Sequence, residues 1–345
     1  MPDPSHEPNP EGGTLPAFPR ELERVSWRFV LRRTWRKFWV HECTDLAAGL
    51  TYYGIIGVFP GLIVLVSVLG LVGKGQASVT TLTGILERAA PQAIIEFATP
   101  ILDSLVGSRN GWGLVLGIAG ALYTVSRYVR AFGRALNRVY GVREGRPIWA
   151  LEARMLLVTV VVGVLTILTV AMLVVSGPVA DLVGQVAGVG PTVVFVWDIV
   201  KWPVVVIIAV IIVAVLYYVT PNVRQPHWRW VSVGALLALI IWGIASAAFG
   251  AYVANFSRYD AIYGSLAGVI VFLVWLWVTN LAVLVGAIVD CELERVRELE
   301  AGHPSETTLQ LPLRDTRLIA KQDRGEELDL ARARSIRTDV GRLDP

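Results

Sequence analysis

The stretch IYGSLAGVIVFLVWLWVTNLAVLVGAIV, residues 262–289, decides the fold class of this chain. It contains no Asp, Glu, Lys or Arg, and it is longer than the roughly 20 apolar residues that a helix needs to cross a bilayer. An uncharged apolar run of this length is typical of a transmembrane helix.

The composition of the whole chain also indicates a membrane protein. Its 345 residues are 54% hydrophobic and only 17% charged, whereas soluble domains carry about 25% charged residues. The mean hydropathy is +0.57. Charged residues gather in the two tails and in one internal stretch, so the sequence predicts an all-α, polytopic membrane protein.

Six segments are apolar over all or most of the length that a membrane span requires. They are residues 46–72, 111–126, 155–176, 202–219, 230–255 and 262–289. The second segment is short, and we expect it to continue to about residue 140 as a basic helix. Residues 79–107 mix apolar and charged side chains, which predicts amphipathic helices at the membrane surface. The sequence therefore predicts six transmembrane helices within residues 46–297.

The segments outside the predicted membrane domain are polar. Residues 1–20 contain six prolines and are expected to be a disordered tail. Residues 21–45 combine many basic residues with Trp27, Trp35 and Trp39, which predicts a basic amphipathic helix lying in the membrane interface. A short charged helix should follow the last span, and residues 298–345 are expected to form a disordered cytoplasmic tail.

The positions of Lys and Arg predict the orientation. Of the 31 basic residues, 26 fall on one side of the six predicted spans and four on the other. Because cytoplasmic loops are enriched in Lys and Arg, both termini are expected in the cytoplasm. The chain is therefore expected to be a multi-pass membrane protein; the resemblance described below implies that the membrane is the cytoplasmic (inner) membrane of a bacterium.

Four arginines form the most informative charged pattern. Arg127, Arg130, Arg134 and Arg138 are spaced by three or four residues, which places them on one face of a helix. Such an arginine stripe could bind lipid phosphates or an anionic substrate. The alternative is an ordinary cytoplasmic anchor whose side chains reach the headgroups.

The first span contains candidate hinge residues. Gly57, Pro60 and Gly61 should produce a kink, because proline removes a backbone donor. A kinked helix can move or line a substrate path, but proline also occurs in static spans.

Further candidate binding residues are polar or aromatic groups within or between spans. Tyr52, Tyr53 and Asn280 lie at depth, where they could line a polar transport cavity or bond to neighbouring helices. Asn255, Tyr259 and Tyr263 lie between the last two spans, where they could form an external gate or a hydrogen-bonded turn.

The sequence predicts neither an enzyme nor a cofactor or metal site. There is no phosphate-binding loop, no GxSxG motif and no HExxH motif. Cys43 and Cys291 are too few for a disulfide framework. Membrane lipids with anionic headgroups are the expected partners, nucleic acid is not expected, and a homo-oligomer remains open.

The chain resembles the YihY/BrkB family of bacterial inner-membrane proteins. The resemblance rests on AAGLTYYGIIGVFPGLIVLVSVLGL, RALNRVYGVREGRP and YGSLAGVIVFLVWLWVTNLAVLVGAIVDCELER, and it covers about residues 35–297. It implies six transmembrane helices and supplies no catalytic residues. An older ribonuclease label for the family is regarded as a mistake. Ile288 stands where family members commonly have glutamate.

Three functions differ in how well they fit these sequence features. A permease, exporter or lipid-handling protein for an amphipathic or anionic compound fits the predicted spans, the kinked helix and the arginine stripe. A non-transporting scaffold that organises anionic lipid or partner proteins fits the charged tails. A ribonuclease would need clustered carboxylates, which the sequence does not show.

Overall fold

The computed structural model describes residues 24–72, 111–174, 191–224, 228–254 and 266–340. Within these ranges the regular structure is helical, apart from one isolated bridge between Val223 and Leu313. The helices are α1 (Arg24–Val40), α2 (Cys43–Val72), α5 (Gly111–Tyr140), α6 (Ile148–Val174), α8 (Pro191–Val219), α9 (Trp228–Ala254), α11 (Leu266–Glu300) and α12 (Arg317–Val340). The predictions for residues 1–20 and 79–107 lie outside the described residues.

Four helices of the described part are long and apolar enough to span a membrane. They are the segments Ile148–Leu173, Thr192–Val219, Val233–Val253 and Ala267–Glu300. The chain is therefore a multi-pass, all-α membrane protein. The first two expected spans correspond to α2 and α5, which are not among the four; the uncharged half of α5 is short because arginines begin at Arg127. Six spans thus remain a prediction.

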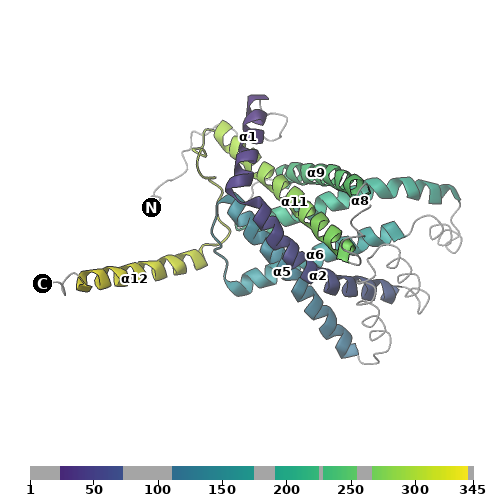
Figure 1. Cartoon of the computed structure of the whole chain (residues 1–345), viewed down its shortest axis with the longest axis horizontal. Coiled ribbons are helices and arrows are strands. Elements are labelled where there is room, and N and C mark those ends of the chain that lie inside the picture. Colours follow the sequence, from purple (N-terminus) through teal and green to yellow (C-terminus); the bar gives the residue numbers. More distant parts are fainter. Residues whose placement is uncertain (1–23, 73–110, 175–190, 225–227, 255–265, 341–345) are drawn as a thin grey trace.

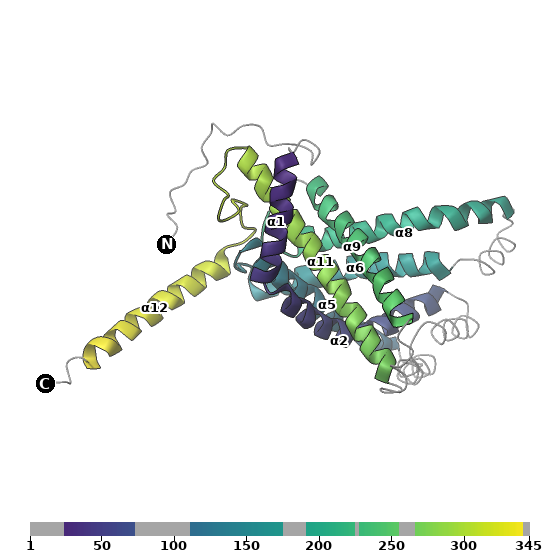
Figure 2. The same ribbon diagram turned by 45° about the horizontal axis from the view of Figure 1, so that its top comes forward.

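The six long helices of the membrane region form a closed ring. Going round, α2 packs on α5, α5 on α6, α6 on α8, α8 on α9, α9 on α11, and α11 returns to α2. The most extensive contacts are α9 with α11 and α2 with α5. Figures 1 and 2 show these helices converging at the end that faces α12 and diverging at the other end.

The core lies at the convergent end of the ring. One continuous cluster of buried apolar side chains includes Leu50, Phe132, Met155, Tyr217, Ala238 and Leu284, so all six helices of the ring contribute to it. Phe132 and Tyr217 stack with ring centroids 6.2 Å apart. Farther along the helices, side chains such as Val164, Val193 and Ile244 are exposed, as expected for surfaces that face lipid rather than protein.

Helix α1 lies across the convergent end and packs on α11. Val30 is buried against Val289, Leu293 and Val296 of α11. The opposite face leaves Leu31, Trp35 and Trp39 exposed, together with Arg28, Arg32 and Arg36. The predicted basic amphipathic helix is therefore present, and its location in the membrane interface stays a prediction.

The chain after α11 differs from the expected disordered tail. Residues 301–316 fold back over the convergent end, and α12 then projects away from the ring (Figures 1 and 2). Ser305 is completely buried, and its hydroxyl donates to Glu298 over 2.5 Å. Hydrogen bonds to the loops between the helices hold this polar segment in place. Hydropathy could not predict these bonds.

Candidate functional site

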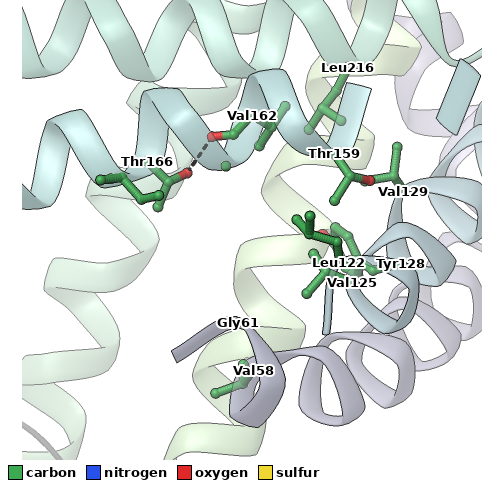
Figure 3. Close-up of a pocket in the computed structure, with 12 residues that line it drawn as sticks. Val58, Gly61, Leu122, Val125, Tyr128, Val129, Thr159, Val162, Thr166 and Leu216 are labelled. Carbon is green, nitrogen blue, oxygen red and sulfur yellow. Dashed lines mark hydrogen bonds between the residues drawn. The ribbon is translucent and has the colours of Figure 1, made fainter. Parts of the chain in front are cut away.

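An apolar cleft lies between α2, α5, α6 and α8 (Figure 3). Its volume is about 370 Å³, and its lining includes Val58, Val125, Val162 and Leu216, one from each helix. The cleft exists because neighbouring helices in the ring separate beyond the packed core. Its volume lies within the usual range of small-molecule sites, roughly 300–1,000 Å³.

The few polar residues of the cleft turn their polar atoms toward backbone or neighbouring helices. The hydroxyl of Thr159 donates to the carbonyl of Met155, and that of Thr166 donates to the carbonyl of Val162, both over 2.8 Å. Figure 3 shows the second of these bonds. Since the hydroxyls bond to their own helix, the cleft offers mainly hydrocarbon to a ligand.

Tyr128 and Asn280 form a polar contact behind the cleft. The Tyr128 hydroxyl donates to Asn280 Oδ1 over 2.7 Å, and Asn280 Nδ2 donates to the Thr51 hydroxyl over 3.1 Å. Asn280 is buried and joins α11 to α5 and α2. The expected polar cavity lined by Tyr52, Tyr53 or Asn280 is therefore not this cleft, which is apolar and has none of the three in its lining.

The two tyrosines of the first span lie in different surroundings. Tyr52 is exposed on the outside of α2. Tyr53 packs against the core, and the guanidinium of Arg134 lies over its ring, 5.5 Å from the centroid. The two rings meet edge to face. Neither side chain lines the cleft, and a binding role for either stays a prediction.

Three members of the arginine stripe interact with other helices. Arg130 pairs with Glu152 of α6, Arg138 pairs with Glu42 between α1 and α2, and Arg134 stacks on Tyr53 as described. Arg127 is exposed and precedes Tyr128 in the sequence, but it lies two residues from both Val125 and Val129 of the cleft lining and so points to the opposite face of α5. The stripe therefore cross-links the convergent end, and none of its four members lines the cleft.

The predicted hinge residues lie where α2 contacts α5. A Cβ at Gly57 or Gly61 would lie 3.6 Å from Val125, which is an ordinary van der Waals contact, so the packing of the two helices would accept alanine at either position. Helix α2 continues through Pro60 and changes direction partway along its length in both views (Figures 1 and 2). Proline is a common cause of such a bend; movement about it stays a prediction. Asn255, Tyr259 and Tyr263 lie outside the described residues.

A network of polar side chains and backbone groups closes the convergent end. The hydropathy pattern of the sequence did not predict this network. The backbone N–H of Asn222 donates to Asn137 Oδ1 over 2.8 Å, and Asn222 Nδ2 donates to the carbonyls of Arg143 and Asp315 over 3.0 and 2.9 Å. The Asp315 N–H returns a bond to Asn222 Oδ1. One asparagine thus joins three separate segments of the chain.

Arg146 and Glu144 complete this network. Arg146 is buried and donates through Nη2 to Glu144 and to the carbonyl of Thr220. Burial alone would raise the pKa of Glu144, but hydrogen bonds from Arg146 and Asn137 outweigh it and lower the pKa below its usual value. At Gly145, an added Cβ would lie 1.8 Å from the Asp315 carbonyl oxygen, so only glycine permits this approach.

The described residues contain no group of three or more His, Cys, Asp or Glu side chains placed to hold a metal ion. Cys43 and Cys291 are buried free thiols. Burial raises the pKa of Cys43 to about 11, against a smaller opposing effect of Arg138.

Comparisons with known proteins identify relatives along most of the chain. A protein of Bacillus subtilis (strain 168), named ribonuclease-like protein YfkH, is 29% identical over 275 residues, which is 79% of this chain and 98% of the relative. UPF0761 membrane protein RSc1559 of Ralstonia nicotianae is 30% identical over 278 residues, which is 80% of this chain and 60% of that protein. A UPF0761 membrane protein of Halorhodospira halophila is 26% identical. The chain thus spans little more than half of the two UPF0761 relatives. No solved structure matches it.

The model of one protein family, described as virulence factor BrkB, matches residues 34–309. This range contains the ring of helices, the cleft and most of the polar network. The chain therefore belongs to the BrkB family of membrane proteins.

Proposed function

We propose that the protein binds a lipid-like amphipathic molecule, with a hydrocarbon chain of that molecule in the cleft between α2, α5, α6 and α8. The observation that carries this proposal is the apolar lining of the cleft, in which even the threonine hydroxyls bond to backbone. A small polar solute would lose hydrogen bonds to water there and gain none in return. An alkyl chain would gain about 25 cal/mol for each Å² of apolar surface that it buries.

An anionic headgroup suits the arginine stripe of α5. Arg127 is exposed on this helix, which also contributes Val125 and Val129 to the cleft, and guanidinium groups bind phosphate and carboxylate through paired hydrogen bonds. The convergent end is closed by the core and by the polar network. We therefore place entry of the ligand at the divergent end or between helices, with movement or exchange of the lipid as the function.

The distribution of basic residues supports a cytoplasmic location for the convergent end. Arg28, Arg32, Arg134, Arg138 and Arg146 all lie there, as the positive-inside tendency predicts. On this proposal the protein resides in the bacterial inner membrane with both termini in the cytoplasm.

A scaffold is the second candidate. The outer face of α1 presents exposed Trp35 and Trp39 among arginines, a pattern that suits anionic lipid surfaces. A scaffold would use this face and would not require the cleft.

Filling the cleft tests the first proposal against the second. Gly163 lines the cleft, and a Cβ there meets nothing within 4 Å, so Gly163→Phe should enter the cleft without disturbing α6. Gly243→Phe is the matched control, because a Cβ at Gly243 of α9 also meets nothing within 4 Å and Gly243 does not line the cleft.

The measurement is labelling of the purified protein by phosphatidylglycerol that carries a photoreactive acyl chain. Gly163→Phe should reduce labelling at least about fivefold, which corresponds to about 1 kcal/mol, and Gly243→Phe should leave it unchanged. Labelling at wild-type strength in both variants would exclude the cleft as the lipid site and favour the scaffold.

A further inference from the structure

Helices α9 and α11 cross closely at two glycines. A Cβ at Gly286 would lie 2.6 Å from Ala238 Cβ and 2.7 Å from the Tyr217 hydroxyl. A Cβ at Gly234 would lie 2.7 Å from Asp290 Cβ and 2.9 Å from Asp290 Oδ1. Not even a methyl group fits on either side of the crossing, so the backbones of the two helices touch there.

Asp290 lies inside this crossing, one turn after Gly286. Only 4% of its surface is exposed, and its Oδ1 atom is buried without a hydrogen-bond partner. The titratable groups that face it from the packed elements are Tyr140 of α5, Tyr217 of α8 and Glu294 of α11. From α9, Gly234 lies against Asp290.

No cation compensates Asp290 among the side chains that the structure describes, which do not include that of Arg229 at the start of α9. The neighbouring arginines bind other carboxylates: Arg33 and Arg295 bind Glu292 over 2.6 and 3.2 Å, and Arg297 binds Glu294 over 2.9 Å. An ionised carboxylate that is buried without a partner costs several kcal/mol. A neutral carboxylic acid in the same place avoids most of that cost.

The groups around Asp290 decide which ligand could neutralise it. A metal ion would need several oxygen ligands at about 2–2.6 Å, and the described residues contain no group of three or more His, Cys, Asp or Glu side chains placed to hold one. A proton needs no further ligand. We propose that Asp290 is a proton-binding site, and that its bound proton keeps α9 and α11 together at the convergent end of the ring.

This inference does not depend on what occupies the cleft. Loss of the proton would place a negative charge between two touching backbones and beside Glu294. The crossing would then separate, and water would reach the convergent end between α9 and α11. Proton binding at Asp290 thus favours closure of the cytoplasmic end of the bundle.

Infrared spectroscopy of the full-length protein in nanodiscs tests the bound proton directly. At neutral pH the wild type should show the carbonyl band of a protonated carboxylic acid, and Asp290→Asn should lose it. Asp45→Asn is the control, because Asp45 is an exposed carboxylate at the start of α2. Loss of a carboxylate band instead of an acid band in Asp290→Asn would overturn the proposal.

Hydrogen exchange tests whether the proton holds the crossing closed. When the pH rises from about 6 to about 9, exchange at residues 233–238 and 283–290, corrected for intrinsic rates, should increase in the wild type and stay constant in Asp290→Asn. The same increase in both proteins would show that Asp290 does not control the crossing. Should Asp290→Asn fail to fold, the wild type decides alone, because absence of the acid band at neutral pH, where ordinary Asp and Glu side chains are ionised, overturns the proposal.

Discussion

Asn280 illustrates how single polar side chains organise this bundle. It lies in the middle of an apolar helix, yet it is buried and its side chain bonds to both Tyr128 and Thr51. Inside a membrane protein, such a side chain has few other partners and holds neighbouring helices in a fixed register. Asn280 therefore connects the three helices α2, α5 and α11.

Substitution Asn280→Ala should destabilise the protein by about 1–2 kcal/mol, because the Tyr128 hydroxyl and the Thr51 side chain lose their shared partner. The measurement is the thermal unfolding of the purified protein in detergent. Tyr52→Ala is the control: Tyr52 is exposed on α2, so its change should stay within about 0.5 kcal/mol. Equal loss of stability in the two variants would argue against a specific role of the polar contact.

The sequence identified Asn280 as a polar group at depth but could not identify its partners. Tyr128 and Thr51 lie 152 and 229 residues away along the chain, so only the arrangement of the helices brings them together. The arginine stripe shows the same limit. Its helical spacing was readable, whereas its pairing with Glu152 and Glu42 depends on how α5 packs.

At the scale of elements, the segment from Pro312 to Leu318 closes the convergent end of the ring by joining two loops. The N–H of Arg224 donates to the Pro312 carbonyl over 2.9 Å, and the N–H of Leu318 donates to the Gly145 carbonyl over 2.8 Å. Arg314 adds two bonds of 2.6 Å to the carbonyls of Val223 and Tyr218. The segment thus serves as a backbone partner for loops that no helix covers.

Docking of this segment should weaken in acid. Hydrogen bonds from Arg317 lower the pKa of Asp315 to about 2, and the pKa of Glu144 is also lowered. Carboxyls with a lowered folded pKa add stability above their unfolded pKa of about 4, and this stability is lost as the pH falls through the folded pKa. Hydrogen exchange at residues 312–318, corrected for intrinsic rates, should therefore rise between about pH 4 and about pH 2.

A pair of variants separates this effect from general acid unfolding. Glu144→Gln should raise exchange at residues 312–318 already at neutral pH, because Arg146 loses its ionic partner. Glu326→Gln, on the exposed surface of α12, should behave as the wild type. Identical profiles for all three proteins would show that Glu144 does not hold the segment.

Elements with an apolar pattern could be predicted, and elements without one could not. Residues 148–173, 192–219, 233–253 and 267–300 form long helices in or around the expected spans, because hydrophobicity alone specifies a membrane helix. The docked segment and α12 are polar, so hydropathy could not distinguish them from a disordered tail. Their order depends on backbone bonds to distant loops.

At the scale of the whole molecule, the two native thiols allow a direct test of orientation. Cys43 and Cys291 are buried, so a membrane-impermeant maleimide should react only with an added cysteine. Ser335→Cys places a thiol on the exposed surface of α12. With the C-terminus in the cytoplasm, this variant should remain unlabelled in intact spheroplasts and become labelled after lysis. Full labelling before lysis would reverse the proposed topology.

The contacts between residues 312–318 and the loops also determine the order in which the protein can fold during synthesis. A ribosome synthesises Asn137, Arg146 and Asn222 long before Asp315, which pairs with Asn222 in the finished protein. A nascent or prematurely terminated chain can therefore insert its apolar helices while its loop ends stay open. Cellular proteases act on incompletely folded chains. A chain that lacks residues 312–318 is therefore expected to be degraded faster than one that contains them.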